Sequence, residues 1–408
     1  MKSDYDIIII GAGPAGAMAG RVAASCGLSV LILERKKIIG YPSHCAGGIL
    51  TLILDQMNLI SVVSESIKTR IRKFRVISPF MRIASHQFKR HIGYIVDRPR
   101  FDQLLCEDAK RKGAEIFTQT RAVGLESQNE ALNTVVIKRN NEVKRIKSKI
   151  IVGADGIASN VAKWAGLSIP RKYVGIGFGY NVKNMRGIDP ETVEIYFLSA
   201  IPGGYAWIFP KGAEMANVGL GGYNSGTYMR RLFEWFRKKH PIASLKLSNA
   251  HLTNYTGGIV PGSKIPRKTT FNHGMIVGDA ANQVDPTTGE GIRLALICGE
   301  LAGRVAVSAI KRNQLSEIHK YHKLWQKSVF IELFVSYLLR HIFLRLNAED
   351  FDIFVKAITR SNLNILLRKR KWYLLFLHGI LKTPTLLKLF RKIALPLPPY
   401  VKPSLKKT

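Results

Sequence analysis

The residues with the most evident chemistry are three glycines and an acid near the start of the chain. Gly11, Gly13 and Gly16 lie in the sequence GAGPAG, and Glu34 follows later. In such a pattern the first glycine permits a tight turn, the second lets backbone N–H groups approach a pyrophosphate, and the third lets a helix pack close to a strand. A carboxylate placed like Glu34 can accept both hydroxyls of a ribose. The pattern predicts a site for the ADP half of a dinucleotide.

These residues need a strand, a helix and a second strand to position them, and the sequence supplies all three in register. Tyr5–Ile10 is a β-branched run typical of a buried parallel strand. Ala17–Cys26 is helix-like, with Gly27 as its stop signal. Leu28–Leu33 is typical of a second strand and ends at Glu34. The N-terminus of the helix adds partial positive charge beside the phosphates.

Two later apolar runs also end in an acid. Ile150–Asp155 continues into Gly156, and Met275–Asp279 precedes PTTGEG and a helix expected to start near Ile292. A strand-end acid and a helix N-terminus can bind the ribityl chain and the O2 edge of a flavin respectively. The motifs GAGPAG, GADG and GDAAN…PTTGEGI resemble the FAD-dependent glutathione-reductase-like group, which includes aromatic hydroxylases, over roughly residues 1–310.

The same resemblance implies a role for an arginine. In that group the arginine of an Asp-Arg pair contacts FAD, and Asp97-Arg98 matches it. The alternative for Arg98 is a salt bridge at the start of a helix. No second GxGxxG follows a strand, so a nicotinamide has no Rossmann site of its own. We therefore expect that the electron donor either binds transiently, as NAD(P)H would, or is another protein such as a ferredoxin.

A different region lies between the flavin motifs. Ile71–Ser78 and Tyr173–Leu220 contain strand-like alternation, which predicts an inserted sheet. Within it, Tyr205, Trp207 and Phe209 alternate with other residues and therefore share one face of a strand. Such an aromatic wall could hold an isoprenoid chain and stabilise developing positive charge. The alternative is ordinary sheet core.

This segment carries a more specific resemblance. PGGYAWIFP, then eight residues, then Gly219-Leu220-Gly221 is similar to the signature of the geranylgeranyl reductase family, whose archaeal members reduce double bonds of digeranylgeranylglycerophospholipids. A second family feature is a cysteine loop against the flavin, here Cys45-Ala46-Gly47-Gly48; some members have glycine where this chain has Ala46. The alternative for Cys45 is a small buried residue. Neighbouring His44 is expected to be an exposed loop residue.

The resemblance implies that reduced flavin delivers a hydride to one alkene carbon while a proton goes to the other. Cys45, Tyr205 or a trapped water could donate that proton. Substrate contacts are expected at Tyr205, Trp207, Phe209, Pro210, Gly219 and Gly221. FAD contacts are expected at Gly11, Gly13, Ala15, Gly16, Glu34, Cys45, Ala46, Gly48, Arg98, Ala122, Asp279, Gly291 and Ile292.

The composition indicates which class of partner the protein binds. The net charge of +34 favours an anionic partner, and a solvated halo of lysines is the alternative. No nucleic-acid-binding motif is present, so a membrane surface is the better match. The segment Lys327–Thr408 has 16 basic against 4 acidic residues, mixed with helically spaced apolar ones. It predicts basic amphipathic helices on an anionic membrane, or alternatively a plain helical cap.

Neither a signal peptide nor a membrane span is apparent, and the four cysteines lack CxxC spacing. We therefore expect a cytoplasmic protein, peripheral to the inner face of the cell membrane, with no metal site.

The expected fold is α/β, with a discontinuous Rossmann-like FAD-binding domain, an inserted antiparallel sheet domain for the substrate and a C-terminal helical region. The expected boundaries are residues 1–70, 97–170 and 271–310 for the first, 71–96 and 171–270 for the second, and 311–408 for the third. Three other functions share parts of this pattern. A flavin monooxygenase leaves YAWIFP unexplained, a halogenase signature WxWxIP differs at two fixed positions, and a carrier of electrons to quinone lacks an iron–sulfur cysteine set.

Overall fold

The computed structural model describes residues 2–129, 132–169, 174–223, 228–262 and 266–359. Its first sheet has the order β18-β19-β11-β1-β2-β8, and β1, β2, β8, β11 and β19 pair in parallel. An antiparallel hairpin, β9 with β10, extends from β11. The strand bounds are Asp4–Ile10 (β1), Val30–Leu33 (β2), Glu115–Phe117 (β8), Arg121–Asn129 (β9), Leu132–Arg139 (β10), Glu142–Gly153 (β11), Thr270–Phe271 (β18) and Gly274–Ile276 (β19).

Helices cover both faces of this sheet, as the continuous apolar runs of its central strands require. On one face Ile7 and Ile9 pack against α1 (Pro14–Ser25), α4 (Arg98–Arg111) and α8 (Ile292–Lys311). On the other face Ile8 and Ile10 pack against the hairpin and α5 (Asn160–Trp164). This is the Rossmann-like architecture that the strand and helix periodicities predicted.

The second sheet has the order β16-β12-β15-β14-β13-β5-β6, with β17 also on β12. Its pairs are antiparallel except β5 with β13, which run parallel. Helices α6 (Met229–Lys239) and α7 (Ala243–Leu247) cover one face. The strand bounds are Lys73–Ile77 (β5), Ile83–Gln87 (β6), Val174–Lys183 (β12), Thr192–Tyr196 (β13), Tyr205–Pro210 (β14), Ala216–Tyr223 (β15), His251–Tyr255 (β16) and Gly258–Pro261 (β17).

A small third sheet connects the two larger ones. It has the order β3-β7-β4 and is antiparallel. Its bounds are Gly48–Leu50 (β3), Ile67–Ile71 (β4) and Gly93–Val96 (β7), and the short helices α2 (Thr51–Gln56) and α3 (Ile60–Val63) lie beside it. Because β3 follows directly on Cys45–Gly47, this sheet fixes where the cysteine loop lies.

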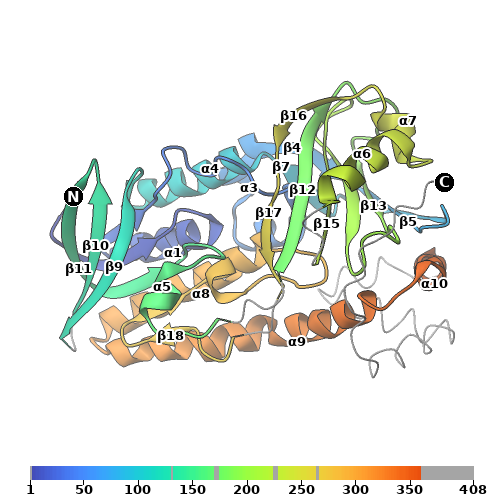
Figure 1. Cartoon of the computed structure of the whole chain (residues 1–408). Helices are drawn as coiled ribbons and strands as arrows, with labels where there is room; N and C mark the ends of the chain where they lie inside the picture. Colours follow the sequence, from blue (N-terminus) through green and yellow to red (C-terminus); the bar gives the residue numbers. More distant parts are fainter. Residues whose placement is uncertain (1, 130–131, 170–173, 224–227, 263–265, 360–408) are drawn as a thin grey trace.

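The long helix α9 (Lys320–Phe343) runs along one side of the molecule, from α8 to the second sheet, and leads to α10 (Ala348–Thr359) (Figure 1). Val329 and Leu333 join the core under the first sheet, whereas Leu339 and Ile342 pack with Phe197 near the second. The helical periodicity expected here is confirmed for the described part. The expected apolar and basic segment beyond residue 359 lies outside the described residues. None of the described helices is both long and apolar enough to cross a bilayer.

Candidate active site

The first glycine turn has the geometry of a dinucleotide cradle. Gly11 has a φ of +111°, and a Cβ there would lie 2.2 Å from the Ala154 oxygen. A Cβ at Gly16 would lie 2.0 Å from the Gly11 oxygen, so both positions exclude a side chain. A Cβ at Gly13, by contrast, would meet no protein atom within 4 Å, and no side chain caps α1. The uncapped amides and the open space above Gly13 fit a pyrophosphate.

Glu34 lies at the end of β2, beside this turn. Its two carboxylate oxygens accept hydrogen bonds from the backbone amides of Ala12, at 3.1 Å, and Lys36, at 2.8 Å. These bonds orient the carboxylate, and each oxygen keeps a lone pair for a ribose hydroxyl. The geometry therefore fits the ADP half that the sequence predicted.

The third flavin motif meets the first. Gly278 has a φ of +64°, and a Cβ there would lie 3.1 Å from that of Ala15. Half-buried Asp279 follows it, and its Oδ1 lies 3.6 Å from where a Cβ of Gly291 would be. Gly291 is the N-cap of α8, which starts at buried Ile292 without a capping side chain. A second open helix N-terminus thus lies beside an accessible acid, as binding of a flavin requires.

Two other predicted positions have evident structural roles. Asp155, in the GADG motif, accepts hydrogen bonds from Ser159 Oγ and from the amides of Asn160 and Val161, so it ties down the start of α5. Ala122 is 8% exposed on β9 and packs in the core. A contact between Ala122 and the cofactor stays a prediction, and it would involve the backbone.

Arg98 makes the salt bridge that was the alternative to a flavin contact. It is the first residue of α4, and its guanidinium pairs with Asp102 at 3.1 Å. Burial lowers the pKa of Arg98, but Asp102 and then Cys45 outweigh this effect and raise it. Arg98 therefore stays charged beside the cysteine loop, where contact with the cofactor stays a prediction.

The cysteine loop lies between the first domain and the second sheet. Half-buried Cys45 accepts a hydrogen bond from the Gly47 amide at 3.4 Å. Gly48 faces the Phe209 ring, which a Cβ would approach to 3.1 Å. His44 is exposed and its Nδ1 lies 2.7 Å from the Gly257 oxygen, so it points away from Cys45 as expected for a loop residue. Ala46, which follows Cys45, is half-buried.

The three aromatic residues of β14 do share one face. Ring centroids are 5.9 Å apart for Tyr205 and Trp207, and 6.3 Å apart for Trp207 and Phe209. The intervening Ala206 and Ile208 are buried in the core under α6. The face of β14 that carries Ala206 and Ile208 is therefore ordinary sheet core, and the aromatic face points away from that core.

Contacts with the flavin motifs define where that aromatic face is directed. The Tyr205 hydroxyl donates to the Thr288 oxygen in the PTTGEG loop, and Phe209 lies against Gly48. On β15, the Tyr223 hydroxyl donates to the Pro286 oxygen. The aromatic wall thus borders the cysteine loop on one side and the PTTGEG loop on the other.

Glycines and a polar cluster support the wall from behind. A Cβ at Gly219 would lie 2.4 Å from Trp207 Cζ2, and one at Gly221 would lie 3.4 Å from Cζ3. The indole Nε1 donates to Asn217 Oδ1 at 2.8 Å. Pro210 is buried, and its oxygen accepts the Thr69 hydroxyl at 2.7 Å. The structure places Gly219 and Gly221 beneath Trp207, and their contact with a substrate stays a prediction.

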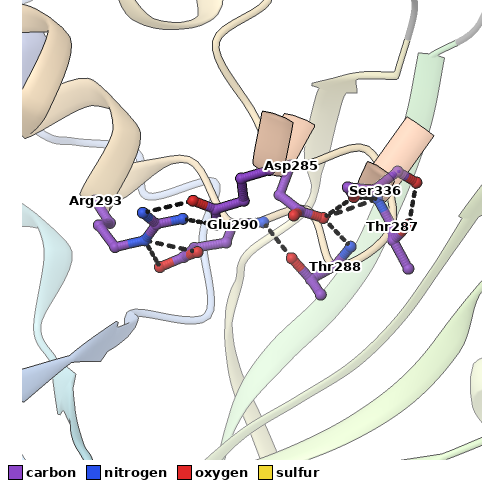
Figure 2. A network of polar contacts seen from close by, with 7 residues as sticks. Asp285, Thr287, Thr288, Glu290, Arg293 and Ser336 are labelled. Carbon is purple, nitrogen blue, oxygen red and sulfur yellow. Dashed lines mark hydrogen bonds and ion pairs between the residues drawn. The ribbon is translucent and has the colours of Figure 1, made fainter. Parts of the chain in front are cut away.

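Sequence reasoning missed a buried polar network beside the wall. Asp285 Oδ1 accepts hydrogen bonds from the amides of Thr287 and Thr288 and from Ser336 Oγ of α9 (Figure 2). Arg293 pairs with Glu290 in the same region (Figure 2). The same guanidinium also pairs with Glu332 of α9. Burial raises the pKa of Glu290, against the effect of Arg293. The acid directly before PTTGEG was the available signal.

Lys211, which directly follows the aromatic strand, was also missed. Its Nζ donates to Asn181 Oδ1 at 3.0 Å. Burial lowers the pKa of Lys211, while Asp97 and Cys45 oppose that shift. A partly desolvated cation therefore lies at the cysteine-loop end of the wall.

Comparison with known proteins agrees with this geometry. Residues 4–204 match the FAD binding domain family, and residues 174–259 match the geranylgeranyl reductase catalytic domain. A digeranylgeranylglycerophospholipid reductase of Methanosarcina acetivorans is 35% identical over 86% of this chain and 88% of its own. A protein of that name from Methanocaldococcus jannaschii is 34% identical over 95% of this chain and 98% of its own.

Solved structures show the same fold. A geranylgeranyl bacteriochlorophyll reductase-like protein of Thermoplasma acidophilum superposes with a TM-score of 0.87 and 27% identity, covering 96% of this chain and 99% of its own. A flavin-dependent brominase reaches a TM-score of 0.72 at 18% identity, covering 90% and 92% of the two chains, and shares the fold alone.

The fold and the site define an FAD-dependent oxidoreductase with a Rossmann-type cofactor domain. Within that class, the chain belongs to the geranylgeranyl reductase family, as its long matches to the curated reductases show. The resemblance that the signature PGGYAWIFP suggested is thereby confirmed.

Proposed function

We propose that this chain saturates the double bonds of geranylgeranyl chains in digeranylgeranylglycerophospholipids. The observation that carries the proposal is the aromatic face of Tyr205, Trp207 and Phe209, which borders both the cysteine loop and the PTTGEG loop. An isolated alkene has no carbonyl to activate it, so positive charge develops on its tertiary carbon as reduction proceeds. Aromatic faces stabilise such charge and also bind the apolar chain.

Bound FAD, when reduced, would supply the hydride. The chain's own residues then have three tasks: the aromatic wall orients the alkene, the buried surroundings exclude water, and a nearby group supplies the proton. Cys45 lies in the loop beside the wall, and Tyr205 is part of the wall; both are our candidates for contact with the reacting atoms. Electrons for FAD would come from NAD(P)H or a ferredoxin-type protein.

Anaerobic reoxidation of the reduced flavin tests this function. The FAD-loaded protein is reduced chemically and mixed with a digeranylgeranylglycerophospholipid, with an aromatic substrate, or with a quinone. Reoxidation by the lipid alone, with a gain of two hydrogens per double bond in the lipid's mass spectrum, is the expected result. Reoxidation only by quinone, or only by oxygen in the presence of the aromatic compound, would refute it.

We further propose that α9 contacts an anionic membrane. Five apolar residues recur on one side of this helix and stay exposed, the most exposed being Ile331 at 66% and Phe334 at 46%. The other three are Leu324, Phe330 and Leu338. Lysines 320, 323 and 327 lie toward the start of the same helix. Apolar side chains flanked by basic ones match the interface of an anionic bilayer, and a lipid substrate would be drawn from there.

Vesicle binding tests the membrane proposal. Ile331→Asp with Phe334→Asp should lower co-sedimentation with vesicles containing anionic lipid at least 10-fold, since two charged groups would replace buried apolar area. Leu245→Asp is a matched control because Leu245 is 76% exposed on α7, which lies far from α9 in Figure 1. Equal binding of the double variant and the control would refute a membrane role for α9.

A further inference from the structure

A basic cavity lies beside the start of α9 and shares no residue with the aromatic wall. Its volume is about 210 Å³, and its walls come from α8, from the 3₁₀ helix η4 (Leu315–His319) and from α9. Three cations line it: Arg304 on α8, Arg312 directly after α8, and Lys320 at the first position of α9. Of the described residues that line it, only Glu317 is acidic. The balance of charge therefore favours an anion in the cavity.

Glu317 holds the walls of this cavity together. Its side chain is 7% exposed, and its Oε2 accepts the Ser308 hydroxyl at 2.7 Å. Its Oε1 accepts Lys320 Nζ at 2.7 Å and the Arg312 guanidinium at 3.4 Å. The hydrogen bonds from Lys320 and Ser308 lower the pKa of Glu317, so the carboxylate is ionised. Because Lys320 and Arg312 are 62% and 66% exposed, the acid lies beneath the two cations and orients them.

The three cations keep hydrogen-bond donors for a further group. In the part of the chain that the structure describes, the Arg304 side chain bonds only to Glu300, and those of Arg312 and Lys320 bond only to Glu317. A guanidinium has five N–H donors and an ammonium has three, so several donors stay available. A phosphate presents acceptor oxygens on several sides and forms charge-assisted bonds with such donors. Three cations around one cavity therefore suit a phosphate.

The cavity lies on the same face of α9 as the exposed apolar residues. Lys320 and Leu324 line the cavity and are one helical turn apart. Ile331, Phe334 and Leu338 follow at intervals that keep them on that face, because a helix has 3.6 residues per turn. Leu324 is 39% exposed, so it belongs both to the cavity and to the apolar stripe.

This position favours a lipid as the source of the phosphate. When an amphipathic helix lies on a bilayer, its apolar side chains enter the acyl region and its flanking cations lie among the lipid headgroups. The cavity also has two apolar lining residues, Val305 and Leu324. Apolar side chains suit the glycerol and acyl carbons of a phospholipid, but they give a free phosphate ion no favourable contact.

We propose that this cavity binds the phosphate headgroup of a membrane phospholipid. The inference rests on the proposed membrane contact of α9, not on the proposed reaction. A headgroup held by Arg304, Arg312 and Lys320 would fix the start of α9 at the bilayer surface. The phospholipid bound there would be separate from the lipid whose alkene reacts at the aromatic wall.

Calorimetric titration of the FAD-loaded protein tests the site. The ligands are dihexanoyl phosphatidic acid, kept monomeric below its micelle concentration, and inorganic phosphate. We expect saturable binding of the lipid and at least 10-fold weaker binding of inorganic phosphate. Arg304→Gln with Arg312→Gln should weaken lipid binding at least 10-fold, because charge-assisted bonds are lost. Both side chains are more than 60% exposed, so the melting temperature should stay close to that of the wild type.

Lys144→Gln with Arg145→Gln is the matched control. It removes the same two charges from β11, where both side chains are exposed to a similar extent, at 61% and 62%. Each of them also pairs with an acid, as Arg304 and Arg312 do. Lipid binding by this control should equal that of the wild type. The difference between the two double variants isolates the cavity from the general positive charge of the protein.

The contrary outcomes are distinct. Absence of saturable lipid binding, or equal binding by the wild type and Arg304→Gln with Arg312→Gln, would refute the site. An equal loss in the control would show that diffuse charge binds the lipid, and would refute it too. Inorganic phosphate bound as tightly as the lipid would overturn the assignment to a phospholipid. Because the lipid is monomeric, its binding without vesicle binding would refute the membrane contact of α9 and leave the phospholipid site in place.

Discussion

The support behind Trp207 makes a sharp prediction about one glycine. A Cβ at position 219 would lie 2.4 Å from Trp207 Cζ2 and 2.9 Å from the Phe178 oxygen. Carbon atoms pack at about 3.5–4.0 Å, so Gly219→Ala must displace the indole by about 1 Å. The displacement is resisted because Asn217, which accepts the indole N–H, is itself bonded to Asn181 and Thr256.

The cost follows from two effects. Overpacking a core typically destabilises by about 1–3 kcal/mol, and a strained or lost Trp207–Asn217 hydrogen bond adds about 1 kcal/mol. We expect Gly219→Ala to lower the free energy of unfolding by about 2–4 kcal/mol. A wall displaced by about 1 Å should also slow lipid-driven flavin reoxidation by about 100-fold.

Gly221→Ala is the matched control. Its Cβ would lie 3.4 Å from Trp207 Cζ3, a contact that small adjustments relieve, so its stability should stay within about 1 kcal/mol of the wild type. Denaturant titration followed by circular dichroism measures both variants. The FAD dissociation constant should be unchanged in each, because the cofactor cradle lies elsewhere. Equal stabilities for the two variants, or a stable Gly219→Ala with full reoxidation rate, would refute the reasoning.

Three further predictions concern the cofactor cradle and a buried histidine. Gly13→Ala should leave the melting temperature of the FAD-free protein unchanged, since its Cβ meets no protein atom within 4 Å. It should raise the FAD dissociation constant at least 10-fold in a fluorescence titration. An unchanged affinity would place the pyrophosphate elsewhere. Gly299→Ala, in contrast, should destabilise the protein. Its Cβ would lie 2.3 Å from the Ala15 oxygen, so α8 and α1 must move apart. The free energy of unfolding measured by thermal unfolding should fall by about 2–4 kcal/mol. Burial lowers the pKa of His240 from 6.5 to about 4, so the unfolded chain binds a proton between these values that the folded chain does not. The free energy of unfolding therefore has its full value above pH 6.5 with respect to His240. It decreases as pH falls below 6.5, by about 3 kcal/mol near pH 4. His240→Asn, which can still accept the amides of Ile242 and Ala243, should lose that part of the pH slope in urea titrations, and an unaltered slope would contradict the assignment.

The sequence by itself determined the cofactor domain and the family. A β-branched strand, glycines at fixed spacing, a helix and Glu34 are local features, and local geometry decides what such a segment can bind. The alternation of Tyr205, Trp207 and Phe209 also fixed their common face, because side chains on a strand alternate with period two. The signature around them was specific enough to indicate the family before any fold was known.

Only the tertiary structure decided what the aromatic face meets. Period-two alternation cannot say which face of β14 is core, and the packing of Ala206 and Ile208 under α6 settles it. It likewise cannot show that Gly219 lies beneath Trp207, since that contact joins neighbouring strands. For Arg98, the sequence left a salt bridge and a cofactor contact open, and the structure shows the bridge to Asp102.

Asp285 shows most clearly the difference between what the sequence determined and what only the tertiary structure decided. Its place before PTTGEG was visible in the sequence, but its surroundings depend on burial, on Ser336 from α9 and on Tyr205 and Tyr223 from the second sheet, whose hydroxyls bond to its loop. These partners are between 51 and 80 residues away along the chain. The protonation of an acid is set by the groups packed around it, and only the fold brings those groups together.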